Sequence, residues 1–226
     1  MAVTYRSGPL TLAALASPVV RGARPGPAVL FLHGGFELGT GHWDLTRPFR
    51  AAGYVVLTPS LRGENGQPGG CSLFLDEVDD VLAAAEALAG RPDVDPARLY
   101  LAGHSVGGTL TLLAALASDR FRAAASFSAA PDVVEWSRGR PDRIPFSSDR
   151  PEEFRMRSSV AFADGFRCPA RLYFGEDELW LQPATRRAAL LAERAGLDVR
   201  AVELPGGHDS ANPTSIAAAI GFFREH

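Results

Sequence analysis

The fold of this 226-residue chain is decided by one stretch of ten residues, Tyr100-Leu101-Ala102-Gly103-His104-Ser105-Val106-Gly107-Gly108-Thr109. Residues 98–102 alternate between polar and apolar side chains and end apolar, as a central strand does. Residues 106–117 form an apolar helical run. Ser105 lies at the bend between them in the pattern G-x-S-x-G. Such a sharp turn strains the serine backbone and leaves no space for side chains at the flanking glycines. The pattern therefore predicts an exposed serine nucleophile, and an idle serine in a tight glycine turn is the alternative.

The rest of the chain alternates between buried strands and helices. Strands are expected at 28–32, 54–58, 98–102, 123–128, 170–174 and 199–204, after a first strand within 9–20. Helices are expected at 43–52, 72–89, 106–117, 183–195 and 213–224. This alternation is typical of an α/β fold with a mostly parallel central sheet and helices on both faces. We expect a single domain over residues 1–226, in which the proline-rich and charged segment 129–167 is the candidate for a small cap.

The composition is that of a soluble globular protein without a highly charged partner. Hydrophobic residues make up 46% of the chain, which is enough for a sizeable core, and the formal net charge of −3 implies no nucleic-acid partner. No stretch is apolar for long enough to span a bilayer, and the N-terminus lacks the pattern of a signal peptide. We therefore expect no membrane association and a cytoplasmic protein. All 23 basic residues are arginine, a bias that indicates a GC-rich bacterial genome.

No metal or cofactor is expected from the sequence. Cys71 and Cys168 are far apart and are interpreted as free thiols, and no Cys/His cluster has the spacing of a zinc site. The acidic run at 76–80 is interpreted as a solvated helix face near the positive end of the helix dipole. The tryptophans Trp43, Trp136 and Trp180 are expected in the core or in a pocket wall, with Trp180 just past the turn that carries the acid and Trp136 in the candidate cap.

The general base that a serine nucleophile needs is predicted to be His208. A serine hydroxyl is a weak nucleophile unless a base accepts its proton and a carboxylate orients that base. His208 follows the predicted strand 199–204 and lies in a glycine-rich loop before the last helix. The carboxyl ends of the strands are where an open α/β sheet holds its active site.

The orienting acid has several candidates. Gly175-Glu176-Asp177-Glu178 follows the strand 170–174, and all three of its carboxylates lie near the expected position of the histidine. We favour Asp177, because a short side chain directly after a strand is easily held rigid, with Glu178 as the alternative. Asp132, which follows the preceding strand, is a further alternative.

An oxyanion hole needs two backbone donors. One is the N–H group of Val106, at the start of the helix that follows Ser105. The other is expected from the loop His33-Gly34-Gly35-Phe36, which follows the buried strand 28–32 and whose glycines let the backbone approach a substrate carbonyl. Gly35 and Phe36 are the two candidate donors.

Taken together, these motifs resemble those of the α/β-hydrolase superfamily over nearly the whole chain. Several of them resemble the catalytic domain of the prolyl-oligopeptidase family and its small dienelactone-hydrolase-like relatives. The residues that carry this resemblance are His33-Gly34-Gly35 with Trp43, Leu61-Arg62-Gly63-Glu64-Asn65-Gly66 with Phe74, Glu77-Val78-Asp79-Asp80-Val81, Val94-Asp95-Pro96-Ala97-Arg98-Leu99 and Gly103-His104-Ser105-Val106-Gly107-Gly108.

The resemblance implies a cofactor-free serine hydrolase that forms an acyl-enzyme, with Ser105 as nucleophile, His208 as base and Asp177 as acid. Family members commonly place the acid three residues after the glycine of this strand, which favours Glu178 and leaves the acid open. A serine nucleophile argues against true dienelactone hydrolase chemistry, which uses cysteine, and the chain has no room for the β-propeller of the large oligopeptidases.

The function that we expect is cleavage of carboxylic esters of small substrates. A small serine peptidase of the prolyl-oligopeptidase type is the alternative, and short peptides would then be the substrates. An acyltransferase would use the same residues with an alcohol or amine in place of water. A hydrolase-fold binding protein is a further alternative, which loss of the serine or the histidine would favour, and neither is lost here.

Overall fold

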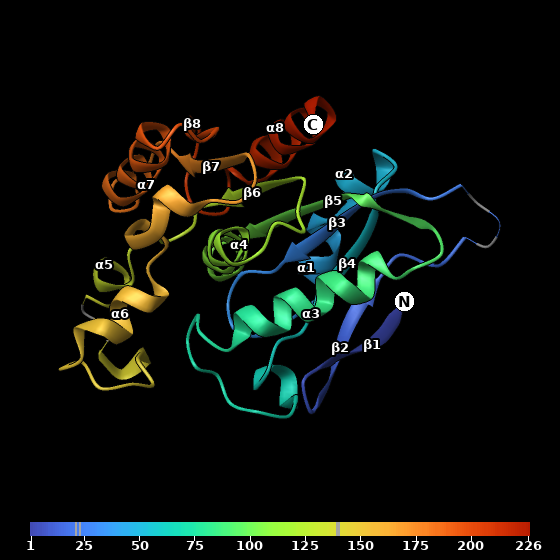
Figure 1. Ribbon diagram of the computed structural model, residues 1–226, viewed down its shortest axis with the longest axis horizontal. Helices are drawn as coiled ribbons and strands as arrows, with labels where there is room; N and C mark the ends of the chain where they lie inside the picture. Colours follow the sequence, from blue (N-terminus) through green and yellow to red (C-terminus); the bar gives the residue numbers. More distant parts are fainter. Residues whose placement is uncertain (21, 23, 139–140) are drawn as a thin grey trace.

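Eight strands form one central sheet in the computed structural model, which describes residues 1–20, 22, 24–138 and 141–226 (Figure 1). The strands are β1 (Ala2–Ser7), β2 (Leu10–Ala16), β3 (Gly26–Leu32), β4 (Val55–Pro59), β5 (Val94–His104), β6 (Ala123–Phe127), β7 (Ala170–Gly175) and β8 (Val199–Leu204). Their order across the sheet is β1-β2-β4-β3-β5-β6-β7-β8. The pairs β1–β2 and β2–β4 are antiparallel, and all later pairs are parallel.

Helices cover both faces of this sheet. One face carries α3 (Glu77–Ala89), α4 (Val106–Ala117) and α7 (Gln182–Arg194), and the other carries α1 (Thr40–Leu45), α2 (Arg47–Ala51) and α8 (Asn212–Glu225). Figure 1 shows α3 and α8 on opposite sides of the strands. The predicted α/β-hydrolase architecture, a mostly parallel sheet between two layers of helices, is confirmed.

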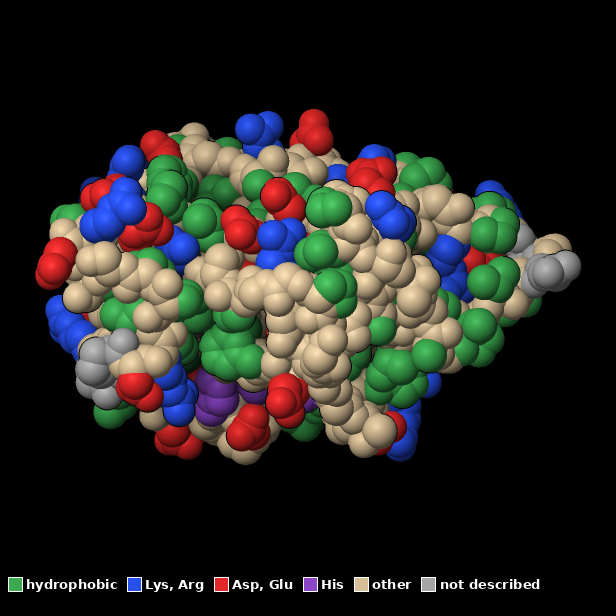
Figure 2. All heavy atoms as spheres, turned by 90° about the horizontal axis from the view of Figure 1, so that it is seen from below, with side chains coloured by type: hydrophobic (Ala, Val, Ile, Leu, Met, Phe, Trp, Pro, Cys, Tyr) green, Lys and Arg blue, Asp and Glu red, His purple; other side chains and the backbone are tan. Residues whose placement is uncertain are grey.

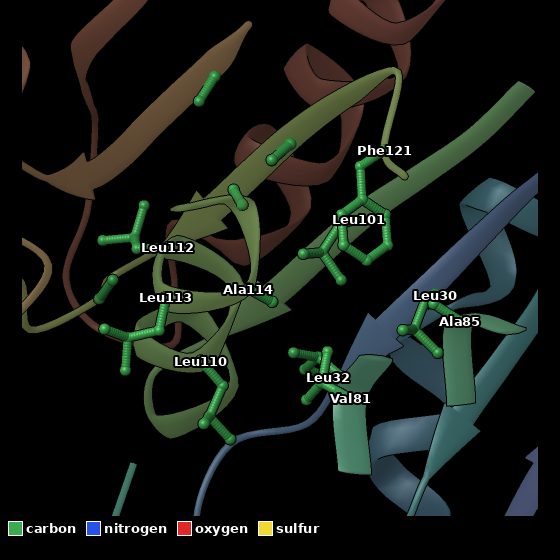
Figure 3. Packing of buried hydrophobic residues seen from close by; sticks show 14 of the residues in the cluster. Leu30, Leu32, Val81, Ala85, Leu101, Leu110, Leu112, Leu113, Ala114 and Phe121 are labelled. Atoms are coloured by element: carbon green, nitrogen blue, oxygen red, sulfur yellow. The ribbon is translucent and has the colours of Figure 1, made fainter. Parts of the chain in front are cut away.

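The larger part of the core lies between the sheet and the helices α3 and α4. Figure 3 shows Leu30 beside Ala85 and Leu32 beside Val81, so that β3 packs directly on α3. Burying a leucine side chain fully stabilises the fold by about 1.5–3 kcal/mol. Because both faces of the central strands are covered in this way, their sequences are continuous apolar runs rather than alternating ones.

The N-terminal third differs from the sequence prediction in two places. The edge strand β1 was not expected, although its exposed and buried residues alternate as in a strand with one face on the core. The helix expected over 43–52 is two short helices, α1 and α2, with Pro48 in the first turn of the second. Proline cannot donate a backbone hydrogen bond, so it starts a new helix there instead of continuing the first.

The helix expected over 72–89 begins only at Glu77. The carboxylate of Glu77 accepts hydrogen bonds from the N–H and the hydroxyl of Ser72, at 2.6 and 2.8 Å, and from the N–H of Leu75 at 3.1 Å. Residues 72–76 therefore form a loop folded around this buried carboxylate instead of a first helical turn.

The acidic run at 76–80 is not a fully solvated face as predicted. Glu77 and Asp80 are buried, whereas Asp76 and Asp79 are exposed. Asp80 accepts hydrogen bonds from the Arg62 backbone N–H and from both Nε and Nη2 of its guanidinium, at 2.9, 2.9 and 2.8 Å. These carboxylates fasten the loop before α3 to the helix, and within the described ranges no group of three potential ligands forms a metal site.

The segment predicted as a cap, 129–167, connects β6 to β7. It contains α5 (Val133–Ser137), α6 (Pro151–Arg157) and the 3-10 turns η2 (Pro141–Arg143) and η3 (Ser159–Gly165), whereas residues 139–140 lie outside the described part. Arg157 is buried and donates through Nε and Nη2 to the Ser72 carbonyl, at 3.1 and 3.0 Å. These two hydrogen bonds connect the segment 129–167 to the loop before α3. Figure 1 shows α5 and α6 together at one end of the molecule, beyond α4.

The structure bears on two expectations from the sequence, the state of the two cysteines and the lack of a membrane span. Cys71 and Cys168 are free thiols, the first exposed and the second buried. Among the helices in the described part of the chain, none has both the length and the apolar character to cross a bilayer.

Candidate active site

Ser105 occupies a strained turn between β5 and α4. Its backbone angles are φ 55° and ψ −115°, a region that residues with a side chain rarely adopt. A Cβ added to Gly103 would collide with the Gly107 carbonyl, and one added to Gly107 would collide with the carbonyls of Leu32 and His33. The two glycines of the pattern are therefore required by close backbone contacts, as the sequence predicts.

His208 lies between the serine and a buried carboxylate. Its Nε2 atom is 2.9 Å from the Ser105 hydroxyl oxygen, and its Nδ1 atom is 2.7 Å from Oε1 of Glu178. The hydrogen bond to Glu178 raises the pKa of His208 against the opposing effect of partial burial. The loop after β8 thus places an imidazole where it can accept the serine proton.

The carboxylate at His208 belongs to Glu178, the alternative acid, and the structure does not bring Asp177 to the histidine. Asp177 is exposed, while Glu178 is buried. The N–H of Glu178 donates to the Gly175 carbonyl at 3.0 Å, which closes a tight turn after β7. This turn directs the third residue after the glycine back over the sheet edge and the second residue outward, so the longer glutamate side chain reaches the histidine.

Two further groups hold the Glu178 carboxylate. Its Oε2 atom accepts hydrogen bonds from the Gly175 N–H and the Ser128 hydroxyl, both at 2.7 Å. Burial raises the pKa of Glu178, but the hydrogen bonds from His208, Gly175 and Ser128 outweigh it and leave the pKa below its ordinary value. The carboxylate is therefore charged and fixed in one orientation. Asp132 does not reach it, because its side chain accepts from the Val134 and Glu135 N–H groups and caps α5.

Sequence reasoning missed Ser128 and the contribution of His104. Ser128 directly follows β6 with a positive φ of 50°, which turns its hydroxyl toward Glu178. His104 is buried inside the elbow, and its Nε2 atom lies 2.9 Å from the His208 carbonyl oxygen. Burial lowers the pKa of His104, which favours the neutral ring. A single serine after a strand carries no sequence signal, and the position before the serine in the elbow pattern accepts many residue types.

The glycine loop after β3 lies beside the serine. Gly35 adopts a positive φ of 71°, and Gly35, Phe36 and Val106 line the same cavity as Ser105. In the part of the chain that the structure describes, no acceptor is bonded to the N–H groups of Gly35 and Phe36. The structure thus brings all three predicted oxyanion-hole residues to the serine.

The buried side chains of His33 and Glu64 hold this loop in place. The Nε2 atom of His33 is 3.0 Å from Oε2 of Glu64, and its Nδ1 atom is 3.0 Å from the Gly34 carbonyl oxygen. Oε2 of Glu64 also accepts the Leu61 N–H at 2.8 Å. The loop that carries the candidate oxyanion donors is therefore tied to the loop after β4.

Two cavities open on either side of Ser105. One has a volume of about 250 Å³ and is lined by Val106, Thr109, Ala130, Trp136, Arg143 and Trp180. The other is more open, has a volume of about 550 Å³, and is lined by Glu37, His42, Leu45, His104 and Asp209. Figure 2 shows histidine side chains gathered at one place on the surface, with hydrophobic side chains directly beside them and charged side chains around. The predicted placement of Trp136 and Trp180 in a pocket wall is confirmed.

Known proteins resemble this chain in sequence and in fold. Residues 29–215 match the alpha/beta hydrolase family. The uncharacterized peptidase YtmA of Bacillus subtilis is 26% identical, covering 73% of this chain and 67% of that protein. A puromycin-hydrolyzing peptidase of Mycobacterium tuberculosis superposes with a TM-score of 0.82 at 25% identity, covering 99% of this chain but only 40% of its own length.

A smaller relative matches end to end. A putative dienelactone hydrolase of Klebsiella pneumoniae superposes with a TM-score of 0.74, covering 100% of this chain and 99% of its own, and at 17% identity this likeness shows the fold alone. The resemblance to peptidases and to dienelactone-hydrolase-like proteins is confirmed, and the comparisons indicate a hydrolase. The chain belongs to the alpha/beta hydrolase family.

Proposed function

We propose that this protein is a serine hydrolase that works through an acyl-enzyme, with Ser105 as nucleophile, His208 as base and Glu178 as the orienting acid. The observation that carries the proposal is the continuous chain of two hydrogen bonds, 2.9 Å from Ser105 to His208 and 2.7 Å from His208 to Glu178. A nucleophile joined to a base that is itself held by a carboxylate is the arrangement that serine acyl transfer needs.

In the first half of the reaction, the Ser105 oxygen attacks the substrate carbonyl while its proton passes to Nε2 of His208. The negatively charged Glu178 stabilises the imidazolium that forms, without taking its proton. The tetrahedral intermediate then collapses, the bond to the leaving group breaks, and His208 donates its proton to the leaving oxygen or nitrogen. Water, activated by His208 in the same way, adds to the acyl-enzyme and releases the acid.

The charge on the intermediate is stabilised by backbone donors. Val106 N–H lies at the start of α4, where the helix dipole favours negative charge, and Gly35 or Phe36 supplies the second donor. Loss of one such donor costs about a hundredfold or more in rate. No metal is needed for these steps.

The substrate that the site fits best is an ester with a small acyl group. The acyl group stays bound through both half-reactions, so we assign it to the more enclosed cavity of about 250 Å³ beside Val106 and Thr109. The leaving group must depart after the first step, so we assign it to the open cleft of about 550 Å³ beside His42 and Leu45. We also propose that the segment 129–167 acts as a small cap within a single domain, because Trp136 and Arg143 from this segment form one wall of the enclosed cavity.

A small serine peptidase is the second candidate. The relatives found by sequence are called peptidases, which favours short peptides as substrates. The chemistry at Ser105 would be the same, with an amine as the leaving group. An acyltransferase on this fold would pass the acyl group from Ser105 to an alcohol or amine instead of water, and a binding protein would form no acyl-enzyme.

Labelling with a fluorophosphonate probe tests the proposal, with wild type compared with Ser105→Ala and with hydrolysis of 4-nitrophenyl esters and peptide 4-nitroanilides measured beside it. We expect labelling that Ser105→Ala abolishes, together with faster turnover of short-chain esters than of anilides. Anilide turnover exceeding that of the esters would favour the peptidase. A stable acyl-enzyme that only added alcohols or amines discharge would favour the acyltransferase. A folded wild-type protein without labelling would refute the hydrolase.

A further inference from the structure

Arg143 lies in the wall of the cavity that contains Ser105. It comes from the turn η2, far from Ser105 in sequence, and it lines the same cavity of about 250 Å³ as the nucleophile. It also lines a neighbouring cavity of about 440 Å³ together with Cys71, Leu73 and Ile144. The guanidinium therefore belongs to the wall between the proposed acyl site and the space beyond it.

Arg143 forms no ion pair with a carboxylate within the described ranges, and the nearest acidic residue in the chain, Asp142, lines the 440 Å³ cavity but not the 250 Å³ one. Some arginines of the same segment have carboxylate partners, since Arg138 pairs with Glu135 at 2.8 Å and Arg157 pairs with Glu153 at 2.7 Å. For Arg143 no ion pair or hydrogen bond is formed with the described residues, and none of the residues lining the 250 Å³ cavity is acidic. Among the described residues, the proposed acyl site therefore has the arginine charge of Arg143 and no acidic side chain in its wall.

The remaining walls are apolar or uncharged. Trp136 is buried and Trp180 is 48% exposed, and both line the cavity with Ala130. Indole rings pack well on methylene groups, whereas a guanidinium presents several N–H donors in a planar fork that matches a carboxylate. The cavity thus combines an apolar part beside the nucleophile with one cationic group on the wall.

We propose that the preferred substrates carry a carboxylate at the end of the acyl group remote from the scissile carbonyl, and that Arg143 binds it. The substrate class is then the monoesters of aliphatic dicarboxylic acids. The methylene groups lie against Trp136 and Trp180, and the terminal carboxylate accepts hydrogen bonds from Arg143. This inference rests on the proposed function, because it names the acyl group that Ser105 would receive.

The test compares acids of matched length that differ only in the terminal charge. Mono-4-nitrophenyl glutarate, adipate and pimelate are each compared with the 4-nitrophenyl ester of the neutral acid with the same carbon number, with background hydrolysis subtracted. The measured quantity is the ratio of kcat/KM for the charged ester to that for the neutral one. We expect a ratio of roughly fivefold or more at one chain length, the value of a modest exposed ion pair.

The variants separate recognition by Arg143 from a structural effect. Arg143→Gln removes the charge and brings the ratio to about one, and Arg143→Lys restores part of it, because a point charge remains without the planar fork. Arg138→Gln is the matched control, since Arg138 lies in the same segment, pairs with Glu135 and lines neither cavity. In wild type the ratio also falls as sodium chloride is raised, since salt screens exposed charges. A ratio near one in wild type, or an equal loss for both esters in Arg143→Gln, would overturn the proposal.

A binding measurement keeps this result distinct from the proposed hydrolase chemistry. Titration calorimetry with mono-4-nitrophenyl adipate is carried out on Ser105→Ala, which cannot form the acyl-enzyme, and on Ser105→Ala combined with Arg143→Gln. Weaker binding to the second protein supports the carboxylate site even if the wild type shows no turnover. Turnover without charge preference, together with equal binding by both proteins, refutes the carboxylate site and leaves the hydrolase intact.

Discussion

The Nε2 atom of His104 lies 2.9 Å from the backbone carbonyl oxygen of His208, so the elbow holds the loop of the proposed base directly. The two imidazole rings are also in contact, with centroids 4.8 Å apart and planes tilted by 49°. On its other side, His104 fills the space above Gly34, because a Cβ added there would come within 2.9 Å of its Nδ1 atom. One buried ring therefore sets the spacing between the nucleophile turn, the oxyanion loop and the base loop.

We expect His104→Leu to lower kcat by about fivefold or more with little change in KM, because the His208 carbonyl loses its donor and the base shifts relative to Ser105. A net hydrogen bond of about 1 kcal/mol corresponds to this factor. His104→Gln retains a donor near the Nε2 position and is expected to recover most of the loss. Steady-state kinetics of both variants provide the measurement. Equal activity of the two variants would show that the hydrogen bond does not position the base.

Glu178→Gln is expected to lower kcat/KM by roughly a thousandfold or more, because the amide cannot stabilise the imidazolium and favours the wrong tautomer of His208. Asp177→Asn is the matched control, since Asp177 is exposed and adjacent in sequence, and we expect its activity to remain within about twofold of wild type. Kinetics with a short 4-nitrophenyl ester measure both. The reverse ranking would restore Asp177 as the acid.

The pH profile gives an independent test of the same pair. His208 acts as a base only when unprotonated, so kcat/KM rises with pH through its pKa. The hydrogen bond to Glu178 raises that pKa, whereas burial lowers it. In Glu178→Gln the raising interaction is lost, and the ascending limb of the profile is therefore expected to move to lower pH. A limb that stays in place would mean that another group controls the ionisation.

Glu64→Ala is expected to slow fluorophosphonate labelling by about tenfold, because the buried His33 ring loses its partner and the loop carrying Gly35 is no longer held. An unsatisfied buried group costs about 1–3 kcal/mol, so urea unfolding will show a loss of stability of that size. Glu64→Gln keeps an acceptor oxygen toward His33 and is expected to restore most of the labelling rate. Labelling at the wild-type rate in Glu64→Ala would show that the pair does not support the loop.

Gly107→Ala is expected to destabilise the protein by about 1–3 kcal/mol or more, because the added methyl group would meet the carbonyls of Leu32 and His33. Gly221→Ala is the control within a helix. A Cβ at Gly221 has nothing within 4 Å, so the higher helix propensity of alanine should stabilise α8 by about 1 kcal/mol. Urea unfolding of the two variants measures both effects, and a stabilised Gly107→Ala protein would contradict the steric explanation of the elbow.

Much of the fold was predictable because local patterns carry it. The helix predicted over 106–117 agrees with α4 at both ends, and the strand predicted over 199–204 agrees with β8. In both elements apolar periodicity and flanking turn residues point to the same structure. The edge strand β1, which pairs with the adjacent strand β2 in a hairpin, was missed. The loop at 72–76 was missed because its conformation depends on the buried carboxylate of Glu77.

The sequence by itself determined the elbow at Ser105, the glycine loop and His208, because each is a short pattern whose backbone geometry permits few residue types. Only the tertiary structure decided that Glu178 and not Asp177 lies at His208, since this placement depends on how a turn closes over the sheet edge and not on which carboxylates are present. The hydrogen bond of Ser128 to Glu178, and the place of Arg143 in the wall of the cavity at Ser105, likewise join residues from separate elements. Long-range packing creates them, and no local pattern along the chain records it.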